Sequence, residues 1–285
     1  MIMTFPLVSA AWLAEHLQDP DLAIADCRFN LMQPTAGRQQ YDTAHIPGAY
    51  YLDLNQDLSS PVQAHGGRHP LPDLSIFTAT LQAMGIHSEP RDRPTLVVAY
   101  DDSRMAFAAR LWWLLRYLGH DHVAILDGGW SAWTAAGYPT QSERPTARAG
   151  QFLARPRTEW IVDVAQVKAR KDLPTVALVD SRESDRYRGE REPIDPVAGH
   201  IPGAWNYPWQ EVTTEQGVAR SPEAQRERWA TLPTTDEIIV YCGSGVTACV
   251  NLLALELAGI STGKLYPGSW SDWCSYADHP VATHD

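Results

Sequence analysis

Four short sequence landmarks occur twice in this chain of 285 residues, in the same order. A repeat of this length indicates two duplicated domains and not a solenoid, whose units span about 20–50 residues. The paired landmarks are Asp26-Cys27-Arg28 with Asp180-Ser181-Arg182, His45-Ile46-Pro47-Gly48-Ala49 with His200-Ile201-Pro202-Gly203-Ala204, Val97-Val98-Ala99-Tyr100-Asp101 with Ile238-Ile239-Val240-Tyr241-Cys242, and Gly129-Trp130-Ser131 with Ser269-Trp270-Ser271.

Each half alternates short apolar strands with helical patterns. Such alternation predicts the α/β class, here two tandem domains that each contain a parallel sheet flanked by helices. We expect an N-terminal domain over residues 1–140, a linker rich in Pro, Arg and Ala over 141–157, and a C-terminal domain over 158–285. The clearest predicted helices are 9–18, 104–118, 163–171 and 247–257, and the clearest strands are 22–26, 95–100, 123–126, 175–180, 237–241 and 264–266.

Cys242 lies where a reactive sulfur is best held. It follows the strand predicted over 237–241 and precedes the helix predicted over 247–257, so it falls at a helix N-terminus. Backbone N–H groups and the helix dipole favour an anion there, and the thiolate is the reactive form of cysteine. The alternative is a buried structural cysteine. Gly243 and Gly245 favour the functional interpretation, because they let the backbone wrap closely around a bound group.

Composition and charge exclude several classes. The net charge of −11 argues against a nucleic-acid surface or an anionic membrane surface. No apolar run approaches the roughly 20 residues of a membrane span, and the first ten residues do not resemble a signal peptide. Four scattered cysteines give no disulfide framework and no zinc-ligand spacing, so we expect reduced thiols and a cytoplasmic protein. Cys249 is either a small core residue or a second redox group.

Taken together, these motifs resemble the tandem-domain rhodanese family of sulfurtransferases over essentially the whole chain. The loop Cys242-Gly243-Ser244-Gly245-Val246-Thr247-Ala248 is similar to that of the 3-mercaptopyruvate sulfurtransferases. Asp101 stands in the first half where Cys242 stands in the second, and a carboxylate cannot carry a transferable sulfur. We therefore expect the N-terminal domain to be catalytically silent, which is also what the resemblance implies.

The chemistry that suits this loop is covalent sulfur transfer through a persulfide on Cys242. We expect the loop N–H groups, including those of Gly243, Gly245, Val246 and Thr247, to stabilise the charged sulfur. Ser244 is close enough in the loop to pass a proton to the departing group or to position the donor.

The resemblance implies that a histidine and an acid assist the serine. The matching histidine is His69, whose alternative role is that of a loop hydrogen-bonding residue. The acid position falls on Asn55, a departure from the family pattern, so Asp53 is the candidate acid unless the histidine works without one.

An anionic donor requires cationic partners. Arg186 and Arg188 follow the strand that ends at Asp180, and a guanidinium group binds a carboxylate through two parallel hydrogen bonds. The resemblance places a donor-binding arginine at Arg186 and a second one within 192–198. That stretch contains no arginine, and Arg191 is the nearest substitute. The alternative is that these arginines pair with Glu183, Glu190 or Glu192 on the surface.

The predicted reaction moves sulfur from 3-mercaptopyruvate, a small anionic donor, to a thiol such as a thioredoxin-like protein or to cyanide. Thiosulfate is the main alternative donor, and a persulfide carrier without turnover is the alternative class. A cysteine phosphatase would need an arginine six residues after the nucleophile, where Ala248 stands. The chemistry requires no metal and no organic cofactor.

Overall fold

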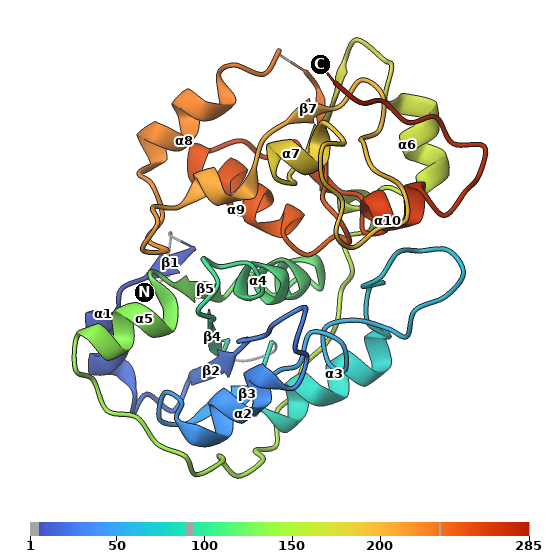
Figure 1. The fold of residues 1–285 in the computed structure, drawn as a ribbon. Coiled ribbons are helices and arrows are strands. Elements are labelled where there is room, and N and C mark those ends of the chain that lie inside the picture. Colours follow the sequence, from blue (N-terminus) through green and yellow to red (C-terminus); the bar gives the residue numbers. More distant parts are fainter. Residues whose placement is uncertain (1–5, 89–93, 234, 285) are drawn as a thin grey trace. The chain divides into compact units, whose positions relative to one another are not determined.

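The computed structural model describes residues 6–88, 94–233 and 235–284 and forms two compact units (Figure 1). Unit 1 contains Met1–Ser60, Pro72–Arg157 and Glu215–Ala219. Unit 2 contains Pro61–Leu71, Thr158–Thr214 and Arg220–Asp285. Two short segments thus pack with the unit built from the other half of the sequence. None of the helices in the described ranges is long and apolar enough to span a membrane.

Unit 1 is a parallel five-stranded sheet in the order β1-β5-β4-β2-β3. Its strands are β1 (Leu7–Val8), β2 (Leu22–Asp26), β3 (Ala49–Tyr51), β4 (Leu96–Tyr100) and β5 (Val123–Leu126). Its helices are α1 (Ala10–His16), α2 (Ala36–Thr43), α3 (Leu74–Ala83), α4 (Ala108–Tyr117) and α5 (Gly129–Ala135). The predicted fold class is confirmed here.

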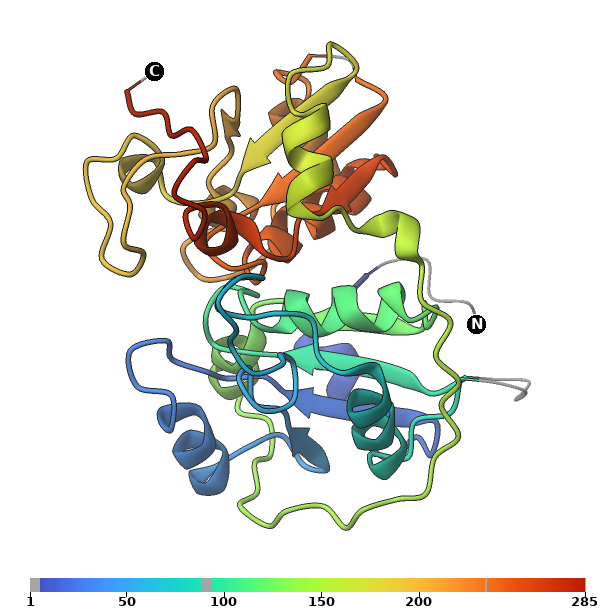
Figure 2. The same ribbon diagram turned by 90° about the vertical axis from the view of Figure 1, so that its right-hand side faces the viewer.

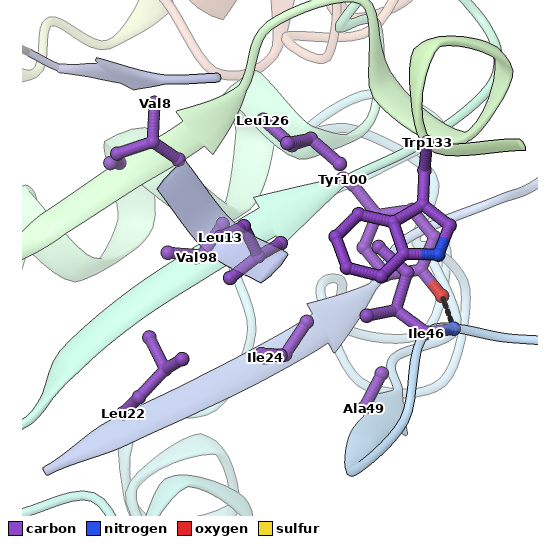
Figure 3. Packing of buried hydrophobic residues seen from close by; sticks show 11 residues of the cluster. Val8, Leu13, Leu22, Ile24, Ile46, Ala49, Val98, Tyr100, Leu126 and Trp133 are labelled. Carbon is purple, nitrogen blue, oxygen red and sulfur yellow. Dashed lines mark hydrogen bonds between the residues drawn. The ribbon is translucent and has the colours of Figure 1, made fainter. Parts of the chain in front are cut away.

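The core on one face of the unit 1 sheet is formed by every second residue of its strands (Figure 3). Ile24 of β2 and Val98 of β4 point to one face of the sheet, where Leu13 of α1 and Trp133 of α5 cover them. Tyr100 is buried in the same cluster, and its hydroxyl accepts a hydrogen bond from the N–H of Ile46 at 3.2 Å.

Unit 2 repeats this plan with a parallel four-stranded sheet in the order β7-β6-β8-β9. Helices α6 and α10 cover one face, where Val167, Trp270 and Trp273 pack against Leu178 and Ile239. Figure 2 shows α6 lying across the strands. The elements are β6 (Val176–Asp180), β7 (Trp205–Asn206), β8 (Glu237–Tyr241), β9 (Gly263–Leu265), α6 (Val164–Arg170), α7 (Ser184–Tyr187), α8 (Pro222–Trp229), α9 (Ala248–Ala258), α10 (Ser269–Trp273) and the 3-10 turns η1 (Thr158–Trp160) and η2 (Trp209–Val212).

Helix α4 begins four residues later than the sequence pattern predicted. The carboxylate of Asp101 accepts hydrogen bonds from the N–H groups of Ser103, Met105, Phe107 and Ala108, at 2.8–3.0 Å. These hydrogen bonds hold the backbone of residues 103–107 around the Asp101 carboxylate. The helix therefore starts only at Ala108. The prediction also missed the helices α2, α3, α5, α7, α8 and α10. Of these, α2 and α8 are short and mostly polar.

The repeated Asp-x-Arg motif forms a buried ion pair in each unit. Arg28 binds Asp26 and Arg182 binds Asp180, both at 2.6 Å. Burial lowers the pKa of Arg182, but the negative charge of Asp180 and its hydrogen bonds outweigh burial and raise this pKa above its ordinary value. The motif is therefore structural in both halves.

The repeated histidines are also structural. His45 lies against the carbonyl oxygen of Tyr41 through Nδ1 at 2.7 Å, and His200 lies in the same way against that of Tyr187 at 2.8 Å. Their backbones form bridges to the segments that follow α5 and α10. Both histidines are thus buried residues that support the core through hydrogen bonds.

We expect Asp180→Ala to lower the free energy of unfolding by about 3–5 kcal/mol, because Arg182 would keep a buried charge without its main partner. The measurement is denaturant unfolding followed by circular dichroism. The matched control is Asp172→Ala, whose side chain is 75% exposed, and we expect its effect to stay within about 0.5 kcal/mol. A loss below about 1 kcal/mol for Asp180→Ala would contradict the assigned role of the ion pair.

Candidate active site

Cys242 is the first residue after β8, and five residues lie between it and the start of α9 at Ala248. The adjacent strands β6 and β9 fix the end of β8. Cys242 is only 2% exposed. The structure therefore places this sulfur beyond the carboxyl end of a central parallel strand and before a helix of eleven residues, the place where ligands collect in such sheets.

The backbone of Cys242 is fixed by the loop before α10. Its N–H donates to Oγ of Ser269 at 3.1 Å, and its carbonyl oxygen accepts from the N–H of Trp270 at 3.0 Å. Ser269 has a φ of 56°, which is uncommon for a residue other than glycine. Its hydroxyl also donates to the carbonyl oxygen of Tyr266 at 2.9 Å. The strained serine thus holds the cysteine in one backbone position.

Both loop glycines are needed at their positions. Gly245 has a φ of 75°, and a Cβ atom there would lie 2.3 Å from the carbonyl oxygen of Pro267. A Cβ atom on Gly243 would lie 3.0 Å from Nη2 of Arg68 and 3.6 Å from Nη2 of Arg186. Gly245 allows the tight turn, and Gly243 leaves room for two guanidinium groups beside Cys242.

Ser244 and His69 form a buried hydrogen-bonded pair. Oγ of Ser244 lies 2.7 Å from Nδ1 of His69, and each residue is 6% exposed. The two residues are 175 positions apart in the sequence. The structure thus brings together two of the predicted site residues beside Cys242, within unit 2.

The segment that carries His69 is attached to α10 at several points. The N–H of Gly66 donates to Asp272 at 2.7 Å, and the N–H of Arg68 donates to Oγ of Ser271 at 3.1 Å. A Cβ atom on Gly67 would lie 2.4 Å from the carbonyl oxygen of Gly268, so the two backbones touch. This attachment fixes the positions of Arg68 and His69 relative to the Cys242 loop.

Arg186 lies at the site as predicted, and Arg68 joins it. Nη2 of Arg186 lies 2.7 Å from Glu192 and 3.3 Å from Asp195, and Nη1 of Arg68 binds the other oxygen of Asp195. Burial lowers the pKa of Arg68, the charge of Arg186 acts in the same direction, and Cys242 and Glu192 oppose them. Sequence analysis missed Arg68, although its place next to His69 was a usable signal.

Three other candidates have local partners. Arg188 binds Glu190 at 2.8 Å, with 38% of its side chain exposed, and Arg191 binds Asp185 at 2.6 Å. Asp53 lies in unit 1, where its carboxylate accepts from the N–H of Asn55 at 2.8 Å. The roles predicted for Arg188 in donor binding and for Asp53 in a proton relay with His69 stay predictions.

The counterpart of the Cys242 loop in unit 1 is filled by its own acid. Four N–H groups surround the carboxylate of Asp101, as described above, and burial raises the pKa of this carboxyl although the N–H groups oppose the shift. A cavity of about 460 Å³ opens beside it, and none of the described residues that line it is a cysteine or a histidine. The same strand–loop–helix junction thus holds an anion in unit 1.

The remaining cysteines differ from Cys242 in their surroundings. Cys249 is fully buried in α9, and its sulfur donates to the carbonyl oxygen of Gly245 at 3.5 Å. Burial raises the pKa of Cys27, with Asp26 acting in the same direction, and burial also raises the pKa of Cys274. All four thiols are free. The pKa shifts keep Cys27 and Cys274 protonated at neutral pH.

These features define the class of two-domain rhodanese-like proteins. The family description "Rhodanese-like domain" matches residues 9–136 and 163–276, and the chain belongs to this family. It is 46% identical over 284 residues to a probable 3-mercaptopyruvate sulfurtransferase from Pseudomonas aeruginosa, covering 98% of each chain. It is 37% identical to a putative thiosulfate sulfurtransferase from Mycobacterium tuberculosis, covering 96% of each.

The fold is shared with a solved structure as well. The crystal structure of a 3-mercaptopyruvate sulfotransferase from Escherichia coli superposes with a TM-score of 0.78 at 32% identity, covering 94% of this chain and 99% of that one. The predicted membership in the tandem rhodanese sulfurtransferases is confirmed.

Proposed function

We propose that this sulfurtransferase takes sulfur from 3-mercaptopyruvate, carries it as a persulfide on Cys242 and passes it to a thiol or to cyanide. The observation that carries the proposal is the Ser244–His69 hydrogen bond beside Cys242. A pair that transfers a proton assists the reaction when the leaving group is a basic carbanion or enolate, as with 3-mercaptopyruvate. It contributes little with thiosulfate, because the leaving group is then sulfite, which is stable as an anion.

The first half-reaction forms a sulfur–sulfur bond. The Cys242 thiolate attacks the sulfur of 3-mercaptopyruvate, the carbon–sulfur bond breaks, and its electron pair remains on the three-carbon fragment as the enolate of pyruvate. The donor thiol supplies one proton, and the Ser244–His69 pair transfers a proton to the enolate carbon. The enolate thereby becomes pyruvate, and the persulfide keeps the negative charge. Pyruvate leaves, and Cys242 holds one additional sulfur atom.

The second half-reaction regenerates the enzyme. An acceptor thiolate or cyanide attacks the outer sulfur of the persulfide, the sulfur–sulfur bond breaks, and its electron pair returns to Cys242 as a thiolate. Two half-reactions through a covalent intermediate give ping-pong kinetics. A thioredoxin-like protein is the thiol acceptor in this proposal, and a cytoplasmic location rests on the four free thiols.

Arg186 and Arg68 bind the donor carboxylate, because both guanidinium groups lie beside Gly243, next to the nucleophile. The loop N–H groups from Gly243 to Thr247 and the N-terminus of α9 stabilise the charged sulfur. Unit 1 supports the role of the loop N–H groups, because the corresponding loop binds the carboxylate of Asp101 through its own N–H groups. In this proposal unit 1 is catalytically silent.

We expect kcat/KM to be at least about tenfold higher for 3-mercaptopyruvate than for thiosulfate, or about 1.4 kcal/mol of transition-state preference. The physical reason is that only the first donor uses the Ser244–His69 pair. The measurement is a side-by-side assay with cyanide as the common acceptor. Equal or inverted values would contradict the assignment to 3-mercaptopyruvate. A single stoichiometric loading of sulfur without turnover would instead assign it to the carriers.

A further inference from the structure

The two arginines of the site share one acid. Asp195 accepts from Arg68 through one carboxylate oxygen and lies 3.3 Å from Arg186 through the other. Its side chain is 2% exposed, compared with 28% for Arg68 and 9% for Arg186. A carboxylate held between two guanidinium groups is the arrangement that a bound carboxylate ligand would adopt.

The acids around these two arginines at least balance their charge. Arg68 and Arg186 carry two positive charges, Glu192 and Asp195 carry two negative ones, and Glu183 lies 3.9 Å from Nη1 of Arg186. The other cation nearby, Arg182, binds Asp180 at 2.6 Å and Glu192 at 3.3 Å. The cluster therefore offers no excess positive charge to an incoming anion, although two guanidinium groups are present.

We propose that Asp195 is a specificity-determining residue, a built-in carboxylate that occupies the two-arginine site and selects against dianionic donors. This inference rests on the proposed function. A donor with one carboxylate takes the place of Asp195 on Arg68 and Arg186, so the two guanidinium groups still face a single negative charge. A dianion such as thiosulfate adds a second negative charge close to Asp195, Glu192 and the Cys242 thiolate, and it is repelled.

The test is Asp195→Asn, which removes the charge and keeps the shape and one acceptor oxygen. We expect kcat/KM to rise at least about tenfold for thiosulfate and less than about threefold for 3-mercaptopyruvate, because removal of one charge affects a dianion more than a monoanion. We also expect sulfate, a dianion, to inhibit the variant at least about tenfold more strongly than the wild type. Asp172→Asn, which removes an exposed charge from the same unit, is the matched control.

A merely structural role would lower the rates with both donors by the same factor, and that outcome overturns the inference. Unchanged sulfate inhibition overturns it as well. Asp195→Ser, assayed in the same way, covers the case in which the asparagine variant unfolds. The mass of wild-type protein incubated with 3-mercaptopyruvate distinguishes failure of the proposed function from failure of this inference. If no sulfur adduct forms, the proposed function fails. If it forms and the donor ratio of the variant is unchanged, only this inference fails.

Discussion

Replacement of Cys242 by serine is expected to abolish sulfur transfer with every donor, by at least about a thousandfold in kcat. A serine hydroxyl is not ionised at neutral pH and forms no persulfide. In intact-protein mass spectrometry, the wild type should gain about 32 Da, one sulfur atom, after incubation with the donor. Cys242→Ser should gain nothing. The change is nearly isosteric, so the loop held by Ser269 and Trp270 should remain folded.

The matched control is Cys274→Ser, which removes a thiol at the end of α10 within the same unit. Its sulfur makes only a long contact of 3.9 Å with the carbonyl oxygen of Ser271. This variant should keep the adduct and its turnover. Retained turnover in Cys242→Ser, or loss of the adduct in the control alone, would place the nucleophile elsewhere.

The Ser244–His69 pair is expected to matter for one donor only. Ser244→Ala and His69→Gln should each lower kcat for 3-mercaptopyruvate by about a hundredfold, the usual contribution of a positioned proton donor. With thiosulfate the same variants should lose less than about threefold, because sulfite needs no proton to leave. The measurement is kcat with each donor at saturating cyanide.

The two residues should act as a unit, so the double variant should be no slower than either single variant. The control is Ser261→Ala, an exposed hydroxyl in the loop before β9. Equal losses with both donors would show that the pair only maintains the loop. Additive losses would show that the two side chains work independently.

The sequence alone predicted much of the fold for a local reason. Strands such as β6 and β8 consist of unbroken apolar runs, because both faces of a parallel sheet are covered. The repeat supported these predictions a second time, because each landmark occurs in both halves of the chain. It also separated structural motifs from functional ones, since a motif present in both halves, such as Asp-x-Arg, cannot be specific to the loop cysteine, Cys242, of the second half. Cys242 was predicted on the same basis, because the strand, loop and helix that position it are neighbours in the sequence.

What the sequence alone determined about this protein is therefore its duplicated α/β architecture and the place of Cys242, the predicted nucleophile, between a strand and a helix. Only the tertiary structure decided which cations lie near Cys242. Arg68 comes from a segment that precedes Cys242 by more than half the chain, and Asp195 lies in an irregular loop. Neither residue belongs to a periodic pattern of apolar residues, because a contact between side chains of distant segments does not depend on the period of a helix or a strand.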